Sequence, residues 1–439
     1  MKEIMPAVSR LADILRDKRD LLLVIALMNV VYAFSYFQRV AIPGTIFDEL
    51  QVDMALSSSA VTMLGSIFLY VYGGMQPFSG ALVDRIGPVR ILLTGGTVLT
   101  AGSLLFPLSG TLTMLYVSRF IMGLGASLIY LSLVKQIDGH FSSKHFSILL
   151  SMTLFIGYSG GLLGTRPFEA AVQAFGWRKP LLAVGIACAL AVIICAFITR
   201  RTAVNRRQSI NIQVFPALKR VLKNRDSCVG SYTVSVIFAI YMLIVSVIGK
   251  KMLQDCCSLS SAAAASYTFL LMLSSVIAVS LSGLISRLAG NQRRLLLILS
   301  TVMLLVSLCL AVPVLLGGVL WILPSFILLG ASSMATPICC AYIKEVNDPA
   351  YAATSIGVYN GAAYLSVALL CNGAGAVLDH FGAGVKTTAL AVRYPPEAYG
   401  VILAGCFVLA LSAFISACFI RETYGSNIWS AAQKVLNRV

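Results

Sequence analysis

An arginine inside an apolar segment is the first feature of this sequence that could do chemistry. The stretch YFQRVAIP (36–43) places Arg39 between apolar runs on both sides. A charged side chain at the centre of a membrane helix costs about 2.5–3.5 kcal/mol on insertion scales, so Arg39 needs a compensating environment. A guanidinium keeps its proton near neutral pH, but it can bind a carboxylate, sulfonate or phosphate through paired hydrogen bonds. The residue type therefore favours anion binding.

Arg39 is the last member of a polar stripe. The stripe consists of Asn29, Tyr32, Tyr36 and Arg39, spaced three, four and three residues apart. This spacing places the side chains on one face of a helix, and we expect that face to border a wet site. A second interpretation stays open, because Arg39 lies about 27 Å along a helix that starts at residue 21, close to the thickness of a bilayer core. Its side chain could then extend to water at the membrane surface.

Other charged residues also lie within or beside apolar runs. Arg166 and Glu169 are three residues apart, which predicts an ion pair on one helix face. The pair could be structural, or Glu169 could release Arg166 when a ligand arrives and so act as a coupling residue. Lys250 and Lys251 end another apolar run. They could be rim charges, or Lys250 could be a second positive contact for an anion.

Polar aromatic and amide side chains supply further candidate ligand contacts. Tyr72 and Gln76 belong to one apolar segment, while Asn360 and Tyr364, four residues apart, belong to another. Such groups suit the orientation of a small polar ligand. They could equally form hydrogen bonds between helices.

Composition identifies a polytopic membrane protein. The 439 residues are 58% hydrophobic and 11% charged, with a mean hydropathy of +0.89. A soluble chain of this length needs far more polar surface. The net charge of +16 does not indicate a nucleic-acid partner, because no soluble stretch is long enough to form a basic binding domain.

Segments of about 20 apolar residues are long enough to cross a bilayer as helices. The sequence contains twelve of them, at about 21–47, 57–82, 89–109, 112–136, 145–168, 178–199, 229–251, 262–286, 294–316, 319–343, 351–378 and 398–420. We therefore predict an all-α membrane protein with twelve transmembrane helices. The basic segment 200–228 separates a first six-helix half, 1–199, from a second, 229–439 with its tail, and part of it could form an amphipathic helix on the inner leaflet.

Basic residues are distributed unevenly between the two sides of these spans. With the N-terminus inside, the inner segments hold 24 of the 33 lysines and arginines, and the outer connections hold six. Cytoplasmic segments carry the excess of positive charge, so we expect both termini in the cytoplasm.

Cofactor and metal chemistry receive no support from the sequence. The eleven cysteines show no CxxC spacing, and there are only three histidines. A GxxxxGK[ST] phosphate loop and an HExxH motif are also missing. We expect no metal, no cofactor and no enzymatic activity.

Several motifs resemble those of the major facilitator superfamily. GALVDRIGPVR (80–90) is similar to the signature between spans two and three, and RFIMGLGAS (119–127) to the second signature, in span four. Further segments resemble the superfamily and follow in the right order: FGWRKP (175–180), IKEVNDPAYAATSIGVYN (343–360) and the connection 378–400. GLISRLAGNQRR in the second half repeats the first signature without its aspartate, as repeated halves of secondary transporters do.

The resemblance implies two pseudo-symmetric six-helix bundles around a central cavity, working by alternating access in a bacterial inner membrane. It also implies a gate formed by Gly80, Asp84, Arg85, Gly87, Arg90 and Arg119. We expect the two glycines of the first signature to allow close helix packing. Arg85 and Arg90 could instead be topology markers only, and Arg119 could serve either packing or proton handling.

The carboxylate-poor membrane segments, together with the resemblance, favour a secondary transporter of a small organic anion. We expect Arg39 to bind the anion, with Tyr36, Tyr32, Asn29, Arg166, Lys250, Tyr72, Gln76, Asn360 and Tyr364 as further contacts. Alternatives are a proton-coupled exporter of drugs or neutral metabolites, with Glu169 titrating, and a transporter-like ligand sensor. The expected partners are the substrate and membrane lipids, and we expect a functional monomer.

Overall fold

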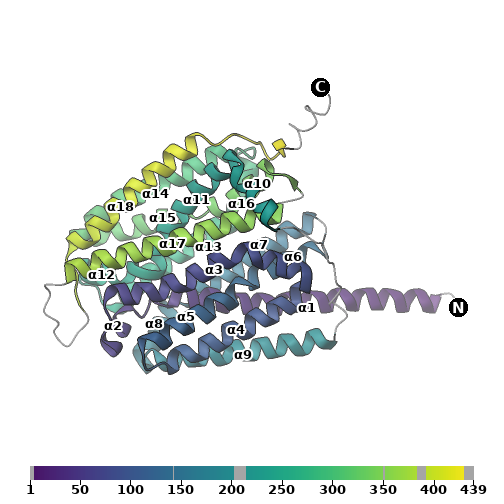
Figure 1. The fold of residues 1–439 in the computed structure, drawn as a ribbon, viewed down its shortest axis with the longest axis horizontal. Helices are drawn as coiled ribbons and strands as arrows, with labels where there is room; N and C mark the ends of the chain where they lie inside the picture. Colours follow the sequence, from purple (N-terminus) through teal and green to yellow (C-terminus); the bar gives the residue numbers. More distant parts are fainter. Residues whose placement is uncertain (1–3, 142, 202–213, 350–351, 383–391, 430–439) are drawn as a thin grey trace.

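Long helices run side by side through most of the molecule. The computed structural model describes residues 4–141, 143–201, 214–349, 352–382 and 392–429, and these ranges contain helices and no strand. Figure 1 shows both chain ends on one side, which we call the termini end, and α2, α8 and α12 on the opposite side, which we call the far end. The all-α prediction is confirmed.

The first half of the chain, α1–α9, ends before the basic linker. Its helices are α1 (Ile4–Ala41), α2 (Phe47–Met54), α3 (Ser58–Ile86), α4 (Pro88–Leu108), α5 (Leu112–Ser127), α6 (Ile129–Asp138), α7 (Ser143–Leu163), α8 (Arg166–Phe175) and α9 (Arg178–Arg201). The predicted fourth span is divided between α5 and α6.

The second half begins with the short helix α10, on the predicted linker. Its elements are α10 (Val214–Lys223), α11 (Arg225–Leu243), the π-helical turn η1 (Ile244–Ile248), α12 (Gly249–Cys257), α13 (Ser261–Leu288), α14 (Arg293–Leu315), the 3₁₀ turn η2 (Val319–Trp321), α15 (Ile322–Ser332), α16 (Ala335–Val346), α17 (Ala352–Gly382) and α18 (Pro396–Cys418). Residues 202–213 of the linker lie outside the described residues.

Eleven helical segments in the described part of the chain are long and apolar enough to span a membrane. The remaining predicted span, 145–168, corresponds to α7, and part of α7 has side chains outside the description. The two halves start their second span in the same way. Ser57 accepts a hydrogen bond from the Ala60 N–H, and Ser260 accepts one from the Ala263 N–H, each at 3.2 Å. These serine N-caps bond amides that the helix itself leaves without partners.

Small residues bring neighbouring helices into close contact. A Cβ atom on Gly95 of α4 would lie 2.7 Å from the Gly125 carbonyl oxygen of α5, and one on Gly123 would lie 2.6 Å from the Phe68 carbonyl oxygen of α3. Glycine at these positions is therefore needed for packing. Gly123 and Gly125 belong to the second motif, RFIMGLGAS.

Two predicted spans end earlier than expected. The first span ends at Ala41, not near 47, because the chain turns at 42–46 after the Pro43 ring interrupts the helix. The fifth ends at Leu163, so Arg166 and Glu169 belong to the separate helix α8. Apolar residues continue past both breaks, which is why hydropathy alone did not reveal them.

Candidate functional site

Arg39 lies in a cage of four aromatic rings. Its side chain is 2% exposed. The cage consists of Tyr36, Tyr72, Tyr364 and Phe68, whose ring centroids lie 4.4, 4.6, 4.7 and 5.7 Å from the guanidinium carbon. The rings come from α1, α3 and α17, so both halves contribute. Cation–π attraction to these faces offsets part of the cost of burying the charge. The alternative of an arginine extending to the membrane surface is wrong.

The guanidinium has hydrogen-bonding capacity left over. One terminal nitrogen donates to the Tyr364 hydroxyl at 2.5 Å, whereas Nε and the other terminal nitrogen have no partner. No carboxylate of the described residues pairs with Arg39, whereas other buried cations, such as Lys250 and Lys251, have carboxylate partners. A buried charged donor without a partner is costly. An anionic ligand would supply the missing acceptors.

The predicted polar stripe is buried and extends into a chain of tyrosines. Tyr36 lies 4.9 Å from Tyr158 and 5.4 Å from Tyr32, measured between ring centroids, and Tyr32 stacks on Tyr130 at 5.7 Å. Asn29 is 4% exposed and its side-chain oxygen has no partner. Sequence reasoning missed Phe68, Tyr130 and Tyr158, because no local spacing connects them to the stripe.

Gln76 and Asn360 form the interhelical hydrogen bond that was the alternative to ligand binding. The Asn360 side-chain N–H donates to Gln76 Oε1 at 3.1 Å, joining α17 to α3. The Gln76 amide donates in turn to the Ser127 carbonyl at 3.4 Å. The backbones also approach closely here, since a Cβ on Gly361 would lie 2.8 Å from the Gly73 carbonyl oxygen.

Arg119 is also deeply buried, and its donors are occupied. Its Nε donates to the Leu64 carbonyl at 2.8 Å, and its terminal nitrogens donate to the Gln38 and Ile42 carbonyls at 3.0 and 3.1 Å. The last two carbonyls belong to the end of α1 and the turn after it, where helical acceptors lack partners. Arg119 thus joins α5 to α1 and α3, which matches the packing alternative.

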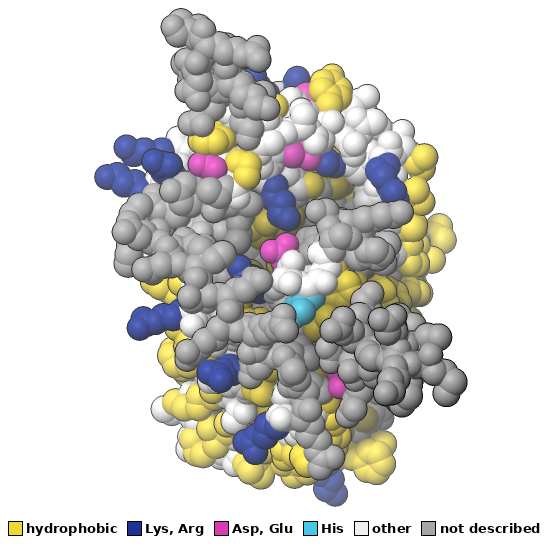
Figure 2. Space-filling view, turned by 90° about the vertical axis from the view of Figure 1, so that its right-hand side faces the viewer, with side chains coloured by type: hydrophobic (Ala, Val, Ile, Leu, Met, Phe, Trp, Pro, Cys, Tyr) yellow, Lys and Arg dark blue, Asp and Glu magenta, His cyan; other side chains and the backbone are white. Residues whose placement is uncertain are grey.

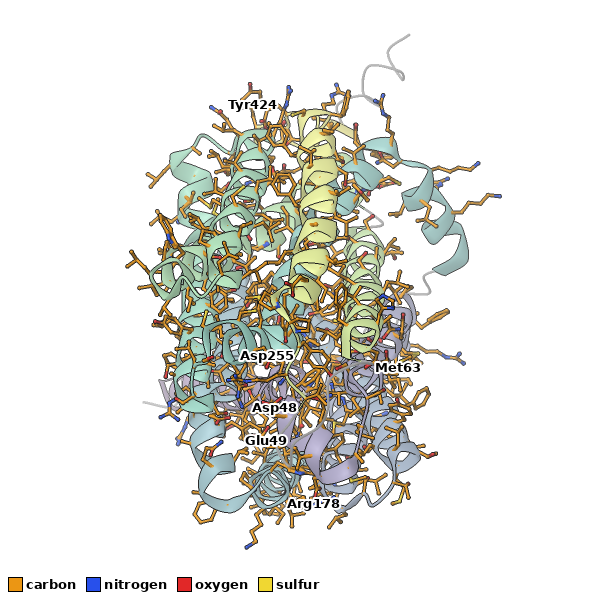
Figure 3. The ribbon with its side chains drawn as sticks, turned by 90° about the vertical axis from the view of Figure 1, so that its left-hand side faces the viewer. Asp48, Glu49, Met63, Arg178, Asp255 and Tyr424 are labelled. Atoms are coloured by element: carbon orange, nitrogen blue, oxygen red, sulfur yellow. The ribbon has the colours of Figure 1, made fainter. Side chains whose placement is uncertain are left out.

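Six charged residues at the far end form a second, largely buried group, which we call the far-end cluster. Its members are Asp48, Glu49, Glu169, Lys250, Lys251 and Asp255, and Figure 3 shows this end with Asp48, Glu49 and Asp255 labelled close together. Lys250 Nζ lies 2.7 Å from a Glu169 oxygen and 3.8 Å from Glu49, and it also donates to the Thr45 carbonyl at 2.5 Å. Lys251 Nζ lies 2.9 Å from both Asp48 and Asp255.

The far-end cluster connects the two halves. Both lysines belong to α12, while Glu49 and Glu169 belong to α2 and α8 of the first half. Glu169 is fully buried and accepts a further hydrogen bond from the Ser261 hydroxyl at 2.5 Å. The expected Arg166–Glu169 ion pair is absent from the described residues, and Lys250 takes its place. Burial raises the pKa of the Glu49 carboxyl, against the opposing effect of Lys250.

A third inter-half contact lies at the same end. Asp379 of α17 accepts hydrogen bonds from the Ser58 and Ser59 backbone N–H groups at 2.7 and 3.0 Å. These amides begin α3, where the helix dipole favours a negative charge. The Gln51 side chain donates to the Tyr394 hydroxyl at 3.0 Å. The structure is therefore closed at the far end. Sequence reasoning missed the acidic partners Asp48, Glu49, Asp255 and Asp379.

The first signature lies at the termini end, where Lys and Arg side chains lie around the rim of the view in Figure 2. Arg85 and Arg90 are exposed, and the Asp84 side chain lies outside the described residues. Gly87 has a φ of +106° and has no close neighbour, and a Cβ on Gly80 would come no nearer than 4.0 Å to another helix. The packing explanation is wrong for these two glycines. Glycine is needed at position 87 instead because any residue with a side chain would be strained in this backbone conformation.

A family model described as the Major Facilitator Superfamily matches residues 26–371. The chain belongs to this superfamily. It is 23% identical over 163 residues to the probable sulfoacetate transporter SauU of Cupriavidus necator, covering 37% of this chain. It is 27% identical over 191 residues to the methyl viologen resistance protein SmvA of Salmonella typhimurium, covering 42% of this chain. Each match spans only 38% of the relative's length.

The fold is also that of a solved transporter. The crystal structure of a mutant of the peptide transporter POT in complex with alafosfalin superposes with a TM-score of 0.71 at 15% identity, over 91% of this chain and 94% of that one. At this identity the likeness shows the fold alone. Together, the superfamily match and this fold identify a multi-pass membrane protein of the predicted fold class.

Proposed function

We propose that this transporter moves a small organic anion and that Arg39 binds the anionic group. The observation that carries the proposal is the buried guanidinium with two nitrogens lacking partners inside an aromatic cage. Arginine forms two parallel hydrogen bonds to a carboxylate or sulfonate, and this geometry uses such a pair of donors. The surrounding rings would contact the apolar part of the ligand.

The ligand class follows from the chemistry of the cage. Four rings surround the guanidinium, so the space beside it suits a compact carboxylate or sulfonate. The relative named for sulfoacetate transport supports this choice, because sulfoacetate carries both groups. Lys250, the predicted second positive contact, is paired with Glu169 in this structure, so we assign the anion to Arg39 alone in this state.

Alternating access would use the contacts at the two ends. We propose that the termini face the cytoplasm, which makes this the state closed to the outside by the far-end cluster. Arg39 belongs to the first half and Tyr364 to the second. An anion that displaces the Tyr364 hydroxyl from Arg39 would change a contact between the halves, which couples binding to their movement.

The first experiment is a thermal-shift screen of the purified protein against carboxylates and sulfonates, followed by uptake into proteoliposomes. A ligand that binds the native state raises its apparent stability. We expect Arg39→Gln to abolish both the shift and the uptake, and Arg39→Lys to retain little of either because lysine lacks the paired donors. Normal uptake by Arg39→Gln would overturn the proposal.

The relative named for methyl viologen resistance makes export of cations the competing function. An exporter of cations needs an acidic group in the site, and Glu169 was the predicted candidate. The same proteoliposomes distinguish the two functions. Efflux of methyl viologen that Glu169→Gln abolishes and Arg39→Gln leaves intact would favour export.

A further inference from the structure

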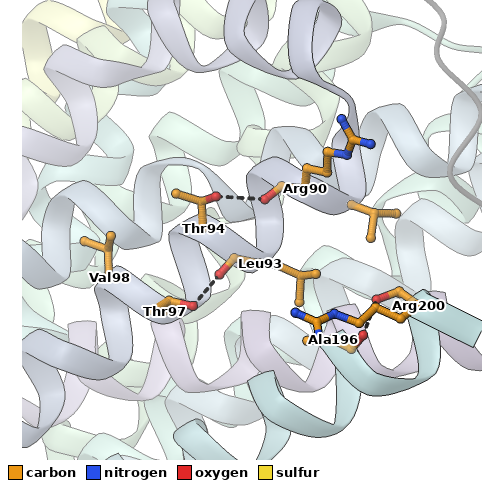
Figure 4. A pocket seen from close by; sticks show the side chains of 9 residues that line it. Arg90, Leu93, Thr94, Thr97, Val98, Ala196 and Arg200 are labelled. Atoms are coloured by element: carbon orange, nitrogen blue, oxygen red, sulfur yellow. Dashed lines mark hydrogen bonds between the residues drawn. The ribbon is translucent and has the colours of Figure 1, made fainter.

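A groove of about 520 Å³ lies between α4 and α9 (Figure 4), and none of the cage residues lines it. Its lining residues are Val89, Arg90, Leu93, Thr94, Thr97, Val98, Ala196, Thr199 and Arg200. Arg90 and Arg200 lie toward one end of the groove, and Val98 lies at the other. The lining therefore changes from cationic to uncharged along the groove.

The threonine hydroxyls do not make the groove polar. Thr94 donates to the Arg90 carbonyl at 3.0 Å, and Thr97 donates to the Leu93 carbonyl at 2.8 Å. Thr199 donates to the Cys195 carbonyl at 2.7 Å. Each hydroxyl donates its proton to a carbonyl of its own helix. Beyond the two arginines, the groove is therefore lined mainly by methyl and methylene groups. Such a surface suits a hydrocarbon chain.

The two arginines have no acidic partner among the described residues. Both side chains are exposed. The second half provides a contrast, because Arg293, at the start of the equivalent helix α14, lies 2.7 Å from the Glu345 carboxylate. The positive charge of the first half is thus available to an anion from outside the protein.

The position of the groove specifies where that anion would come from. Arg90 is in the first turn of α4 and Arg200 in the last turn of α9, and both helices are long and apolar enough to span a membrane. The arginine end therefore lies at a membrane–water interface, where lipid headgroups are found. Large apolar side chains of α9, including Ile193 and Phe197, are exposed beside the groove. They identify this face as one that contacts lipid.

We propose that the groove binds an anionic phospholipid. Its phosphate lies between Arg90 and Arg200, and one acyl chain follows α4 past Leu93 and Thr97 to Val98. The two guanidinium groups supply charge-assisted hydrogen bonds to the phosphate oxygens. This proposal is independent of the transported substrate. It gives Arg90 a role that neither gating nor membrane topology requires.

Native mass spectrometry of the delipidated full-length protein tests the site. We expect phosphatidylglycerol to bind more tightly than phosphatidylcholine. Inorganic phosphate and glycerol 3-phosphate should not bind measurably, because they lack the chain. Arg200→Gln should weaken phosphatidylglycerol binding about fivefold, since each basic contact to anionic lipid contributes a factor of this size. Arg225→Gln, an exposed arginine outside the groove, is the matched control and should bind as wild type does.

Three results would overturn the proposal. Equal binding of the two lipids would remove the role of charge, and equal effects of Arg200→Gln and Arg225→Gln would remove the role of this groove. Binding of soluble phosphate with the affinity of the lipid would identify a phosphate site instead. An Ala196→Trp variant gives a second measurement, because it should block the chain while keeping both arginines. If it retained full lipid binding, the assigned path of the chain would be wrong.

Discussion

The aromatic cage and the far-end cluster both bury cationic side chains within a membrane protein, but they surround the charge with different groups. In the far-end cluster both lysines have carboxylate partners, at 2.7 Å for Lys250 and 2.9 Å for Lys251. In the cage, Arg39 has aromatic faces, one hydroxyl and two nitrogens without partners. We infer that the paired lysines keep the far end closed, whereas the unpaired donors of Arg39 are available to a ligand.

The largest expected effect is at Lys250, where a substitution tests whether the far-end cluster holds the two halves together. Lys250→Met leaves the Glu169 carboxylate buried and unpaired, and breaking a buried pair costs about 3–5 kcal/mol. We expect the far end to open, with faster hydrogen exchange of the α2 amides. The double variant Lys250→Met/Glu169→Gln should regain part of the protection.

Asp53→Asn is the matched control for this experiment. Asp53 lies on α2, as Asp48 and Glu49 do, and the substitution removes its ion pair with Arg178 of α9, but both side chains of that pair are well exposed, at 45% and 39%. Such pairs contribute about 0–1 kcal/mol. Equal exchange in the Lys250 and Asp53 variants would mean that the cluster does not close the far end.

Arg119 and Arg39 allow a buried arginine whose donors have acceptors to be compared with one that has donors left over. Arg119→Gln leaves up to three carbonyl oxygens without their donor, and each unsatisfied buried group costs about 1–3 kcal/mol. We expect a lower melting temperature and unchanged ligand affinity for the folded fraction. Arg39→Gln should show the reverse, with lost affinity and little loss of stability. Loss of affinity in both variants, measured by calorimetry, would remove the distinction.

Glu49 makes the far-end cluster sensitive to pH. Because burial raises the pKa of Glu49 above its ordinary value of 4.5, the closed state binds this proton more tightly than an open state does. Closure is therefore favoured at low pH and weakens as pH rises through the raised pKa. We expect α2 exchange, corrected for the intrinsic pH effect, to increase over that range. Glu49→Gln should reduce this dependence, and an unchanged profile would contradict the assignment.

Tyr364→Phe is expected to have the smallest effect, a change in anion affinity. The substitution keeps the ring of the cage but removes the hydroxyl that occupies one guanidinium nitrogen. A hydrogen bond of this kind contributes about 0.5–1.5 kcal/mol net, so an anion that no longer displaces it should bind severalfold more tightly. Calorimetric titration of wild type and variant measures this. Weaker binding would show that the hydroxyl contacts the ligand itself.

Sequence reasoning was most successful where the informative contacts are local. The stripe from Asn29 to Arg39 is set by helical spacing, and the structure buries all of its members. Spacing did not reveal that Arg39 bonds directly to Tyr364, because 325 residues separate the two along the chain, and the sequence suggested Tyr364 only as a further ligand contact. Glu169 shows how local spacing can mislead. Arg166 is suitably spaced on the same helix, but Lys250 approaches from the other half and takes the carboxylate.

The first signature shows another limit. Its motif predicted the correct family, but the reason for its glycine was backbone conformation at Gly87, not helix packing. Residue type alone does not distinguish these two uses of glycine. The division into domains at 200–228 and the gating roles stay predictions.

The π-helical turn η1 determines which way the two lysines face. The Gly249 N–H donates to the Ile244 carbonyl, five residues back, so this turn contains one residue more than an α-helical turn. One residue corresponds to a rotation of about 100° around a helix axis. Deleting a single residue of η1 would therefore turn Lys250 and Lys251 away from α2 and α8 without altering either lysine or its acidic partners. The closure of the far end thus depends on chain length as much as on residue identity.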